Sequence, residues 1–242
     1  MKVPRVFADT ESVALAGAQY IGELARRSID VRQQFALALS GGRTPWRMLQ
    51  LLAGQEHDWD RWQVFQVDER LVQENDESRN LLHIRQNFAD RIGIQRTQIH
   101  AMEVEAGDLP AAADRYQCEL QSCCGDPPVL DLIVLGLGSD GHMASLVPND
   151  PVLEIDDADV AISAEYQGQK RMTLTLPIIN RARRVVWLVT GEEKGPALRK
   201  MLDRDRSIPA ARVEHEIAVV FANEAAAGTV SNRRISNAQT GI

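Results

Sequence analysis

The chain of 242 residues has no hydrophobic stretch long enough to cross a membrane. Its longest apolar runs have the length of β-strands, far short of the roughly 20 residues that a membrane helix needs. The N-terminal sequence MKVPRVFADTE also lacks the apolar core of a secretory signal. We therefore expect a soluble, cytoplasmic protein that does not bind membranes.

Basic residues are outnumbered by acidic ones, with 27 Lys and Arg against 34 Asp and Glu, which gives a net charge of -7. Proteins that bind nucleic acids or anionic membranes in general need a surplus of Lys and Arg. The composition therefore excludes a general nucleic-acid binder. A small anionic ligand remains possible wherever basic residues cluster locally.

Cysteine is scarce, with only Cys118, Cys123 and Cys124 in the chain. They show neither CxxC spacing nor a neighbouring histidine pattern. We expect reduced, structural thiols and no metal site. Aromatic residues make up only 5% of the chain, which argues against a base-stacking platform.

Helical and strand patterns alternate along the chain, and alternation of this kind predicts parallel strands joined by crossover helices. The expected fold is a doubly wound, mostly parallel sheet with helices on both faces, Rossmann-like, with a few short extra strands. We expect a single domain over residues 1–228, a flexible tail over 229–242, and a monomer by default, although the oligomeric state is open. Helices are predicted at 10–27, 44–53, 78–92, 109–123, 177–182 and 192–202, and strands at 35–39, 62–67, 130–135, 160–164, 172–176, 185–189 and 217–221.

The first polar loop, SGGRTP at 40–45, joins a strand to a helix. Gly41 and Gly42 permit close backbone approach, and a helix N-terminus presents free N–H groups to a phosphate. Arg43 adds a formal charge. The alternative is an ordinary tight turn in which Thr44 caps the helix.

The second loop, VDER at 67–70, follows the strand that ends near Val67. Asp68 and Arg70 can pair, orient a general base or hold a substrate oxygen. A solvated run of charges is the alternative.

The third loop, LGLGSDGHMASLVP at 135–148, places Asp140 and His142 at the end of a buried strand. Open α/β sheets bind ligands at this edge. The loop formally matches GxGxxG, but Pro148 follows too soon for the long helix that a dinucleotide needs. His142 is therefore predicted to serve in chemistry, and its alternative is a histidine that only makes loop hydrogen bonds.

Taken together, these segments resemble the 6-phosphogluconolactonases, relatives of glucosamine-6-phosphate deaminases, over residues 10–225. The resemblance rests on SGGRTP, VDER with SRN at 78–80, LGLGSDGHMASLVP, RMTLTLP at 171–177 and VTGEEK at 189–194. The chain departs from the usual pattern at Gln73, Arg79, Met143 and Val147, and the role of Asn80 is left open.

The resemblance implies a cofactor-free hydrolase whose partner is a small sugar-phosphate lactone. His142 would be the general base, with Asp68 and Arg70 close to the substrate. Asp68 would hold either the imidazole or the attacking water, and Asp140 is the other candidate to hold the imidazole. Arg70 would either bind the phosphate or stabilise developing negative charge, and the sequence does not decide between these roles. The residues expected to bind substrate or its phosphate are Ser40, Gly41, Gly42, Arg43, Thr44, Asp140, Arg171 and Lys194.

Two other functions are weighed. A glucosamine-6-phosphate deaminase usually carries an acidic residue in a GHIAFNEP-like segment, where this chain reads GHMASLVP. A non-catalytic sugar-phosphate sensor would normally add a helix-turn-helix, and the residues before Phe35 offer only one helix. Both features favour the lactonase.

Overall fold

The computed structural model describes residues 3–228, so the tail predicted at 229–242 lies outside the described residues. Seven strands of this part of the chain form one parallel sheet. Their order across the sheet is β1 (Arg5–Phe7), β10 (Ala218–Asn223), β9 (Val185–Val189), β6 (Leu132–Gly136), β2 (Phe35–Leu39), β3 (Trp62–Gln66) and β5 (Ile99–His100). The expected doubly wound sheet is confirmed, and with it a shared carboxyl edge where the loops after β2 and β6 meet.

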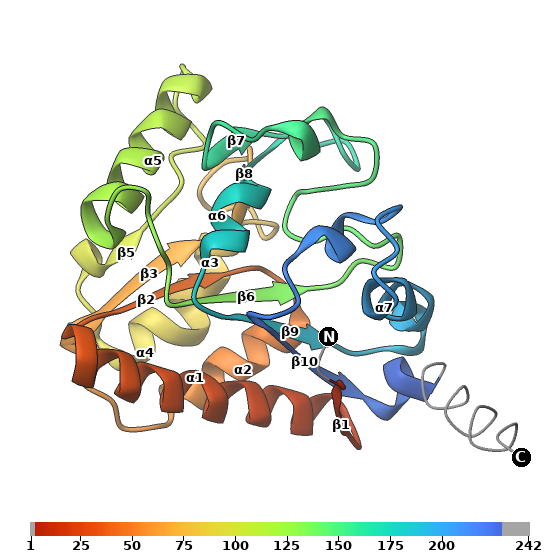
Figure 1. The fold of residues 1–242 in the computed structure, drawn as a ribbon. Helices are drawn as coiled ribbons and strands as arrows, with labels where there is room; N and C mark the ends of the chain where they lie inside the picture. Colours follow the sequence, from red (N-terminus) through yellow and green to blue (C-terminus); the bar gives the residue numbers. More distant parts are fainter. Residues whose placement is uncertain (1–2, 229–242) are drawn as a thin grey trace, which may run out of the picture.

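Helices cover both faces of this sheet (Figure 1). Because the strands are buried on both sides, their alternate side chains enter two separate cores. In β2, Phe35, Leu37 and Leu39 belong to one core, and Ala36 and Ala38 belong to the other. The first core contains α1 (Thr10–Arg32), α2 (Arg43–Ala53) and the helical segment α3 (Asn80–Ile84), η2 (Arg85–Ala89) and α4 (Asp90–Ile92). The second contains α5 (Leu109–Cys124), α6 (Leu176–Arg181) and α7 (Gly195–Leu202).

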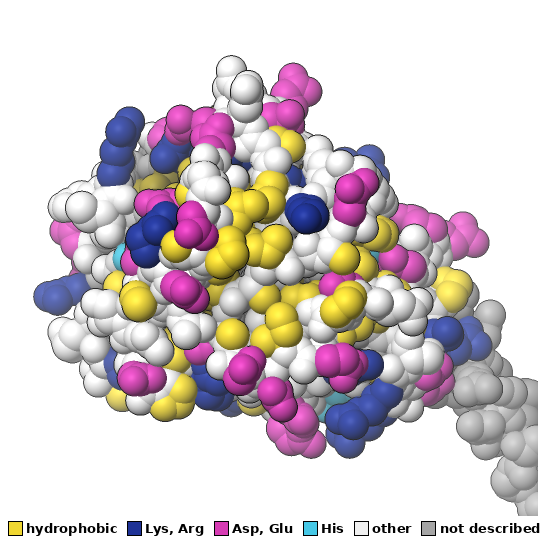
Figure 2. All heavy atoms as spheres, turned by 90° about the horizontal axis from the view of Figure 1, so that it is seen from above, with side chains coloured by type: hydrophobic (Ala, Val, Ile, Leu, Met, Phe, Trp, Pro, Cys, Tyr) yellow, Lys and Arg dark blue, Asp and Glu magenta, His cyan; other side chains and the backbone are white. Residues whose placement is uncertain are grey.

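Three short strands form a second, antiparallel sheet in the order β4 (Asp68–Arg70), β8 (Arg171–Leu174) and β7 (Val160–Ile162). This sheet lies above the central sheet, on the side of α5 and α6 (Figure 1). Seen from that side, hydrophobic side chains gather in the middle of the face, with acidic and basic side chains around them (Figure 2). The small sheet matters for function because its strands β4 and β8 carry charged residues to the edge where the polar loops meet.

Several element boundaries differ from the sequence-based expectations. The VDER segment is not a loop, because Asp68–Arg70 pairs with β8 as a strand. β1 and β5 were not predicted, since strands of three and two residues carry almost no periodic signal. The helix expected at 192–202 is divided into a 3-10 turn, η5 (Glu192–Lys194), and α7. No helix within residues 3–228 combines the length and hydrophobicity of a membrane span.

Candidate active site

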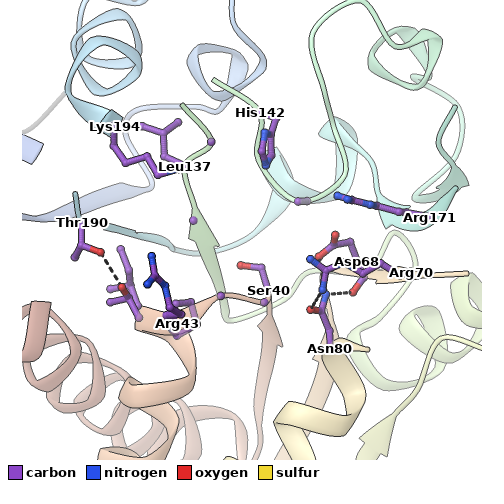
Figure 3. Close-up of a pocket in the computed structure, with 18 of the residues that line it drawn as sticks. Ser40, Arg43, Asp68, Arg70, Asn80, Leu137, His142, Arg171, Thr190 and Lys194 are labelled. Carbon is purple, nitrogen blue, oxygen red and sulfur yellow. Dashed lines mark hydrogen bonds between the residues drawn. The ribbon is translucent and has the colours of Figure 1, made fainter. Parts of the chain in front are cut away.

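A cavity of about 290 Å³ opens at the carboxyl edge of the parallel sheet (Figure 3). The loops after β2, β6 and β9 form one wall, and β4 and β8 of the small sheet form the other. Every predicted site residue except Asp140 lines it: Ser40, Gly41, Gly42, Arg43, Thr44, Asp68, Arg70, His142, Arg171 and Lys194. Asn80, Thr190 and Glu193 also line the cavity, although the sequence assigned them no role.

One end of the cavity is formed by the N-terminus of α2. The N-cap of the helix is Gly42, which has a φ of 129° and provides no capping side chain, so the alternative interpretation, in which Thr44 caps the helix, is wrong. The Thr44 hydroxyl instead lies 2.8 Å from the Thr190 hydroxyl. Uncapped N–H groups and the helix dipole attract anions. The side chains of Arg43 and Lys194 extend into the same end of the cavity (Figure 3).

The opposite end is built on β4. Because side chains alternate along a strand, Asp68 and Arg70 line the cavity while Glu69 points away from it. The Asp68 side chain is buried, with 4% of its surface exposed, which rules out a solvated charge run. Ser145 Oγ donates a hydrogen bond to Asp68 Oδ2 over 2.6 Å.

Asn80 connects Asp68 with Arg70 at the start of α3. Its Nδ2 donates to the Asp68 backbone carbonyl over 2.8 Å, and its Oδ1 accepts a hydrogen bond from Arg70 Nη1 over 2.7 Å (Figure 3). Gly41 must be a glycine here, because a Cβ at that position would collide with Asn80 Oδ1. Asn80 therefore holds Asp68 and Arg70 against the SGGRTP loop at 40–45. Its place in the sequence does not indicate this role.

Glu69 anchors this end from behind, and the sequence analysis missed it. Its fully buried carboxylate accepts hydrogen bonds from Gln66 Nε2 and from the backbone N–H groups of Arg70, Asn80 and Leu81. The Arg79 side chain is also buried, and its Nε lies 3.2 Å from Glu69 Oε2. Glu69 thus joins β4 to the first turn of α3, whose N–H groups would otherwise lack partners.

Arg171 faces Arg70 directly across the β4–β8 pair. Its side chain is buried, with 6% exposed, and its Nε has no hydrogen-bond partner among the described residues. Burial lowers the pKa of Arg171, and Asp68 opposes that effect. Burial raises the pKa of Asp68, although Arg70, the Ser145 hydroxyl and Arg171 counteract part of the rise. The two guanidinium groups make this end a strong site for negative charge.

The loop after β6 carries His142, whose side chain lines the cavity (Figure 3). Its Nδ1 lies 2.6 Å from Asp140 Oδ1, so Nε2 is left for the cavity. Asp140 Oδ1 also accepts the His142 backbone N–H over 3.1 Å. Burial raises the pKa of Asp140, but hydrogen bonds from His142 and Tyr166 and the charge of His142 outweigh it and give a lowered pKa. Asp140 lies behind the imidazole and does not line the cavity.

This arrangement suits proton transfer beside a bound anion, and it does not suit a dinucleotide. From Leu137 to Asn149 the backbone forms turns and no helix, so the glycine loop offers no helix N-terminus to a pyrophosphate. Among residues 3–228, no three His, Cys, Asp or Glu side chains are grouped as metal ligands would be.

Comparison with known proteins identifies the relatives of this chain. The family model of glucosamine-6-phosphate isomerases/6-phosphogluconolactonase matches residues 8–221. A 6-phosphogluconolactonase of Synechocystis is 41% identical over 176 residues, which cover 71% of this chain and 73% of that protein. The crystal structure of a 6-phosphogluconolactonase from Thermotoga maritima superposes with a TM-score of 0.82 at 26% identity, and covers 91% of this chain and 98% of that one.

A structure described as a monomeric glucosamine-6-phosphate deaminase superposes almost as well, with a TM-score of 0.81 at 17% identity over 93% of this chain and 98% of that one. The fold by itself therefore does not separate the two activities. The family model and the relatives above are sufficient to assign the family: the chain belongs to the glucosamine-6-phosphate isomerases/6-phosphogluconolactonases.

Proposed function

We propose that this protein is a 6-phosphogluconolactonase, which hydrolyses 6-phospho-D-glucono-1,5-lactone to 6-phospho-D-gluconate in the oxidative pentose phosphate pathway. The names of the relatives, including the Synechocystis and Thermotoga maritima proteins, support this activity. The observation that carries the mechanism is the His142–Asp140 pair, held over a cavity with cationic groups at both ends. We also propose that residues 1–228 form a single domain. The support is that the two hydrophobic cores lie on opposite faces of one and the same sheet.

In the proposed reaction, Nε2 of His142 takes a proton from water as the water oxygen attacks the lactone carbonyl. The Asp140 carboxylate stabilises the imidazolium that forms, as the acid does in other acid–histidine catalytic pairs. Arg70 balances the negative charge on the carbonyl oxygen, and Arg171 beside it binds the lactone in the ground state as well. When the bond to the ring oxygen breaks, the imidazolium returns its proton to that oxygen, and a carboxylic acid and a hydroxyl group result. The acid then ionises and releases a proton to solvent.

The phosphate group belongs in this proposal at the other end of the cavity, near Arg43, Lys194 and the N-terminus of α2. This placement is supported by the uncapped backbone N–H groups there, which suit a dianion. It also leaves Arg70 beside Asp68 and Arg171 for the carbonyl end, and so favours the charge-stabilising role that the sequence left open.

The test is the rate of acid release from lactone made freshly from glucose 6-phosphate, compared with its spontaneous hydrolysis. His142→Ala should lower kcat by about 10²- to 10⁴-fold, the usual contribution of a general base. His100→Gln is the matched control, because His100 lies on β5 outside the cavity and should retain wild-type activity. Full turnover in His142→Ala would remove His142 from the mechanism.

Glucosamine 6-phosphate tests the competing activity. The segment after His142 contributes only Ala144 to the cavity and no acidic side chain. We therefore expect no ammonia release from glucosamine 6-phosphate, and measurable release would favour the deaminase.

A further inference from the structure

Tyr166 lies at the tip of the hairpin that joins β7 to β8, outside the set of residues that line the cavity. Tyr166 and Gln169 pair across a two-residue turn, through backbone hydrogen bonds of 3.0 and 3.3 Å. The turn residues Gln167 and Gly168 have φ values of 54° and 77°, as a type I′ turn requires. Such a turn fixes the register of the hairpin and with it the place of the Tyr166 side chain.

The Tyr166 hydroxyl contacts the carboxylate that holds His142. It donates a hydrogen bond to Asp140 Oδ2 over 3.1 Å, while Oδ1 of the same carboxylate contacts Nδ1 of His142. Gln167 Nε2 in turn donates to the Tyr166 hydroxyl oxygen over 3.2 Å, so the hydroxyl proton is directed at Asp140. Both oxygens of Asp140 are thereby engaged, and its carboxylate has one preferred rotation.

The Tyr166 ring contacts two further residues of the site. The rings of Tyr166 and His142 pack edge to face, with their centroids 5.5 Å apart and their planes at 62°. The Arg171 guanidinium carbon lies 5.3 Å from the centre of the Tyr166 ring, on its face. A guanidinium over an aromatic face is attracted to it, and the attraction is stronger where water is excluded. One side chain therefore contacts the histidine, its acidic partner and a buried arginine.

We propose that Tyr166 is a positioning residue of the active site, which orients the Asp140–His142 pair through its hydroxyl group and Arg171 through its ring. The inference rests on the proposed lactonase activity, since lactone hydrolysis is the readout. The two contacts predict separable effects. Loss of the hydroxyl group disturbs proton transfer and lowers kcat, while loss of the ring also frees Arg171 and weakens substrate binding.

Two substitutions separate these roles. Tyr166→Phe keeps the ring and should lower kcat about 10-fold with little change in KM, the effect expected for a residue that orients a catalytic group. Tyr166→Leu removes the ring as well and should lower kcat and also raise KM several-fold. Tyr20→Phe is the matched control, because Tyr20 lies on α1 with its ring against Phe221, and it should behave as wild type.

A double-mutant cycle tests whether Tyr166 acts through Asp140. In an Asp140→Asn background, Tyr166→Phe should change kcat less than twofold, because the carboxylate that the hydroxyl group orients is gone. Multiplicative effects of the two substitutions, or wild-type kcat in Tyr166→Phe, would overturn the inference. Equal KM values in the Phe and Leu variants would overturn the role of the ring. Inactive wild-type protein would instead contradict the proposed function itself.

Discussion

Gly138 leaves the space that the imidazole of His142 occupies. A Cβ atom at position 138 would collide with Nδ1 of His142 and with Oδ1 of Asp140. The Gly138 backbone N–H also donates to the His142 carbonyl over 2.8 Å, so the two residues close the loop tightly. The glycine pattern of this loop therefore serves the contact between His142 and Asp140.

Gly138→Ala should remove most of the lactonase activity and leave the fold intact. The added methyl group forces His142 away from Asp140, and misplacement by about 1 Å costs on the order of 10²-fold in rate. The measurement is kcat together with the melting temperature. Gly107→Ala is the control, because nothing lies within 4 Å of a Cβ there, and it should keep full activity. An active Gly138→Ala variant would show that the contact is not needed.

Asp68 should make stability depend on pH in a specific direction. Its pKa in the folded protein is raised by burial, so the folded state binds this proton more tightly than the unfolded state. The contribution of the protonated Asp68 to the free energy of unfolding is complete below the pKa that Asp68 has in the unfolded chain. It is lost as the pH rises through the pKa that Asp68 has in the folded protein. The isosteric variant Asp68→Asn lacks this pH-dependent contribution. The melting temperature of the wild type should therefore rise relative to that of Asp68→Asn as the pH falls toward 4, and a constant difference would contradict the prediction.

Ser145→Ala should move the acidic limb of the activity profile to higher pH. The Ser145 hydroxyl stabilises the charged form of Asp68, so its removal raises the pKa of Asp68 further. If the carboxylate is the active form, more alkaline conditions are then needed to ionise it. The measurement is kcat/KM between pH 4 and 8, with Ser207→Ala on the exposed surface as the control. An unchanged acidic limb would separate Asp68 from catalysis.

The buried Glu69–Arg79 pair should be important for stability. Glu69→Gln removes the charge opposite Arg79 and places an amide N–H₂ among groups that donate hydrogen bonds. We expect a loss of about 3–5 kcal/mol in the free energy of unfolding, the usual result of breaking a buried ion pair. Glu105→Gln is the control, because Glu105 is half exposed and lies 4.0 Å from the same arginine. Its loss should stay below about 1 kcal/mol in urea unfolding.

Lys194 should contribute to binding of the phosphate group. Lys194→Met removes a cation from the end of the cavity beside α2 and should raise KM for the phosphorylated lactone about 10-fold, with kcat largely kept. Hydrolysis of the lactone without phosphate should not respond to the substitution. Lys200→Met, on the exposed side of α7, should leave both constants unchanged. A fall in kcat alone would place Lys194 at the reacting carbonyl instead.

Much of the architecture and most of the cavity follow from local sequence patterns. The alternation of strand and helix places the loops after β2 and β6 at one sheet edge, because parallel strands share a carboxyl end. Ser40, Gly42 and His142 could be grouped for this reason. The strand β4 could not be predicted, since three charged residues show no hydrophobic period and pair with β8 about 100 residues later in the chain.

The amino-acid sequence determined the central sheet, the glycine loops and the identity of the groups that line the cavity. Only the tertiary structure decided which side chains hold those groups in place. Glu69, Asn80 and Tyr166 act through contacts that depend on the packing of the small sheet against the loops. Hydrophobic periodicity reports whether a residue is buried, while a hydrogen bond between distant residues depends on side-chain direction, which only the assembled fold defines.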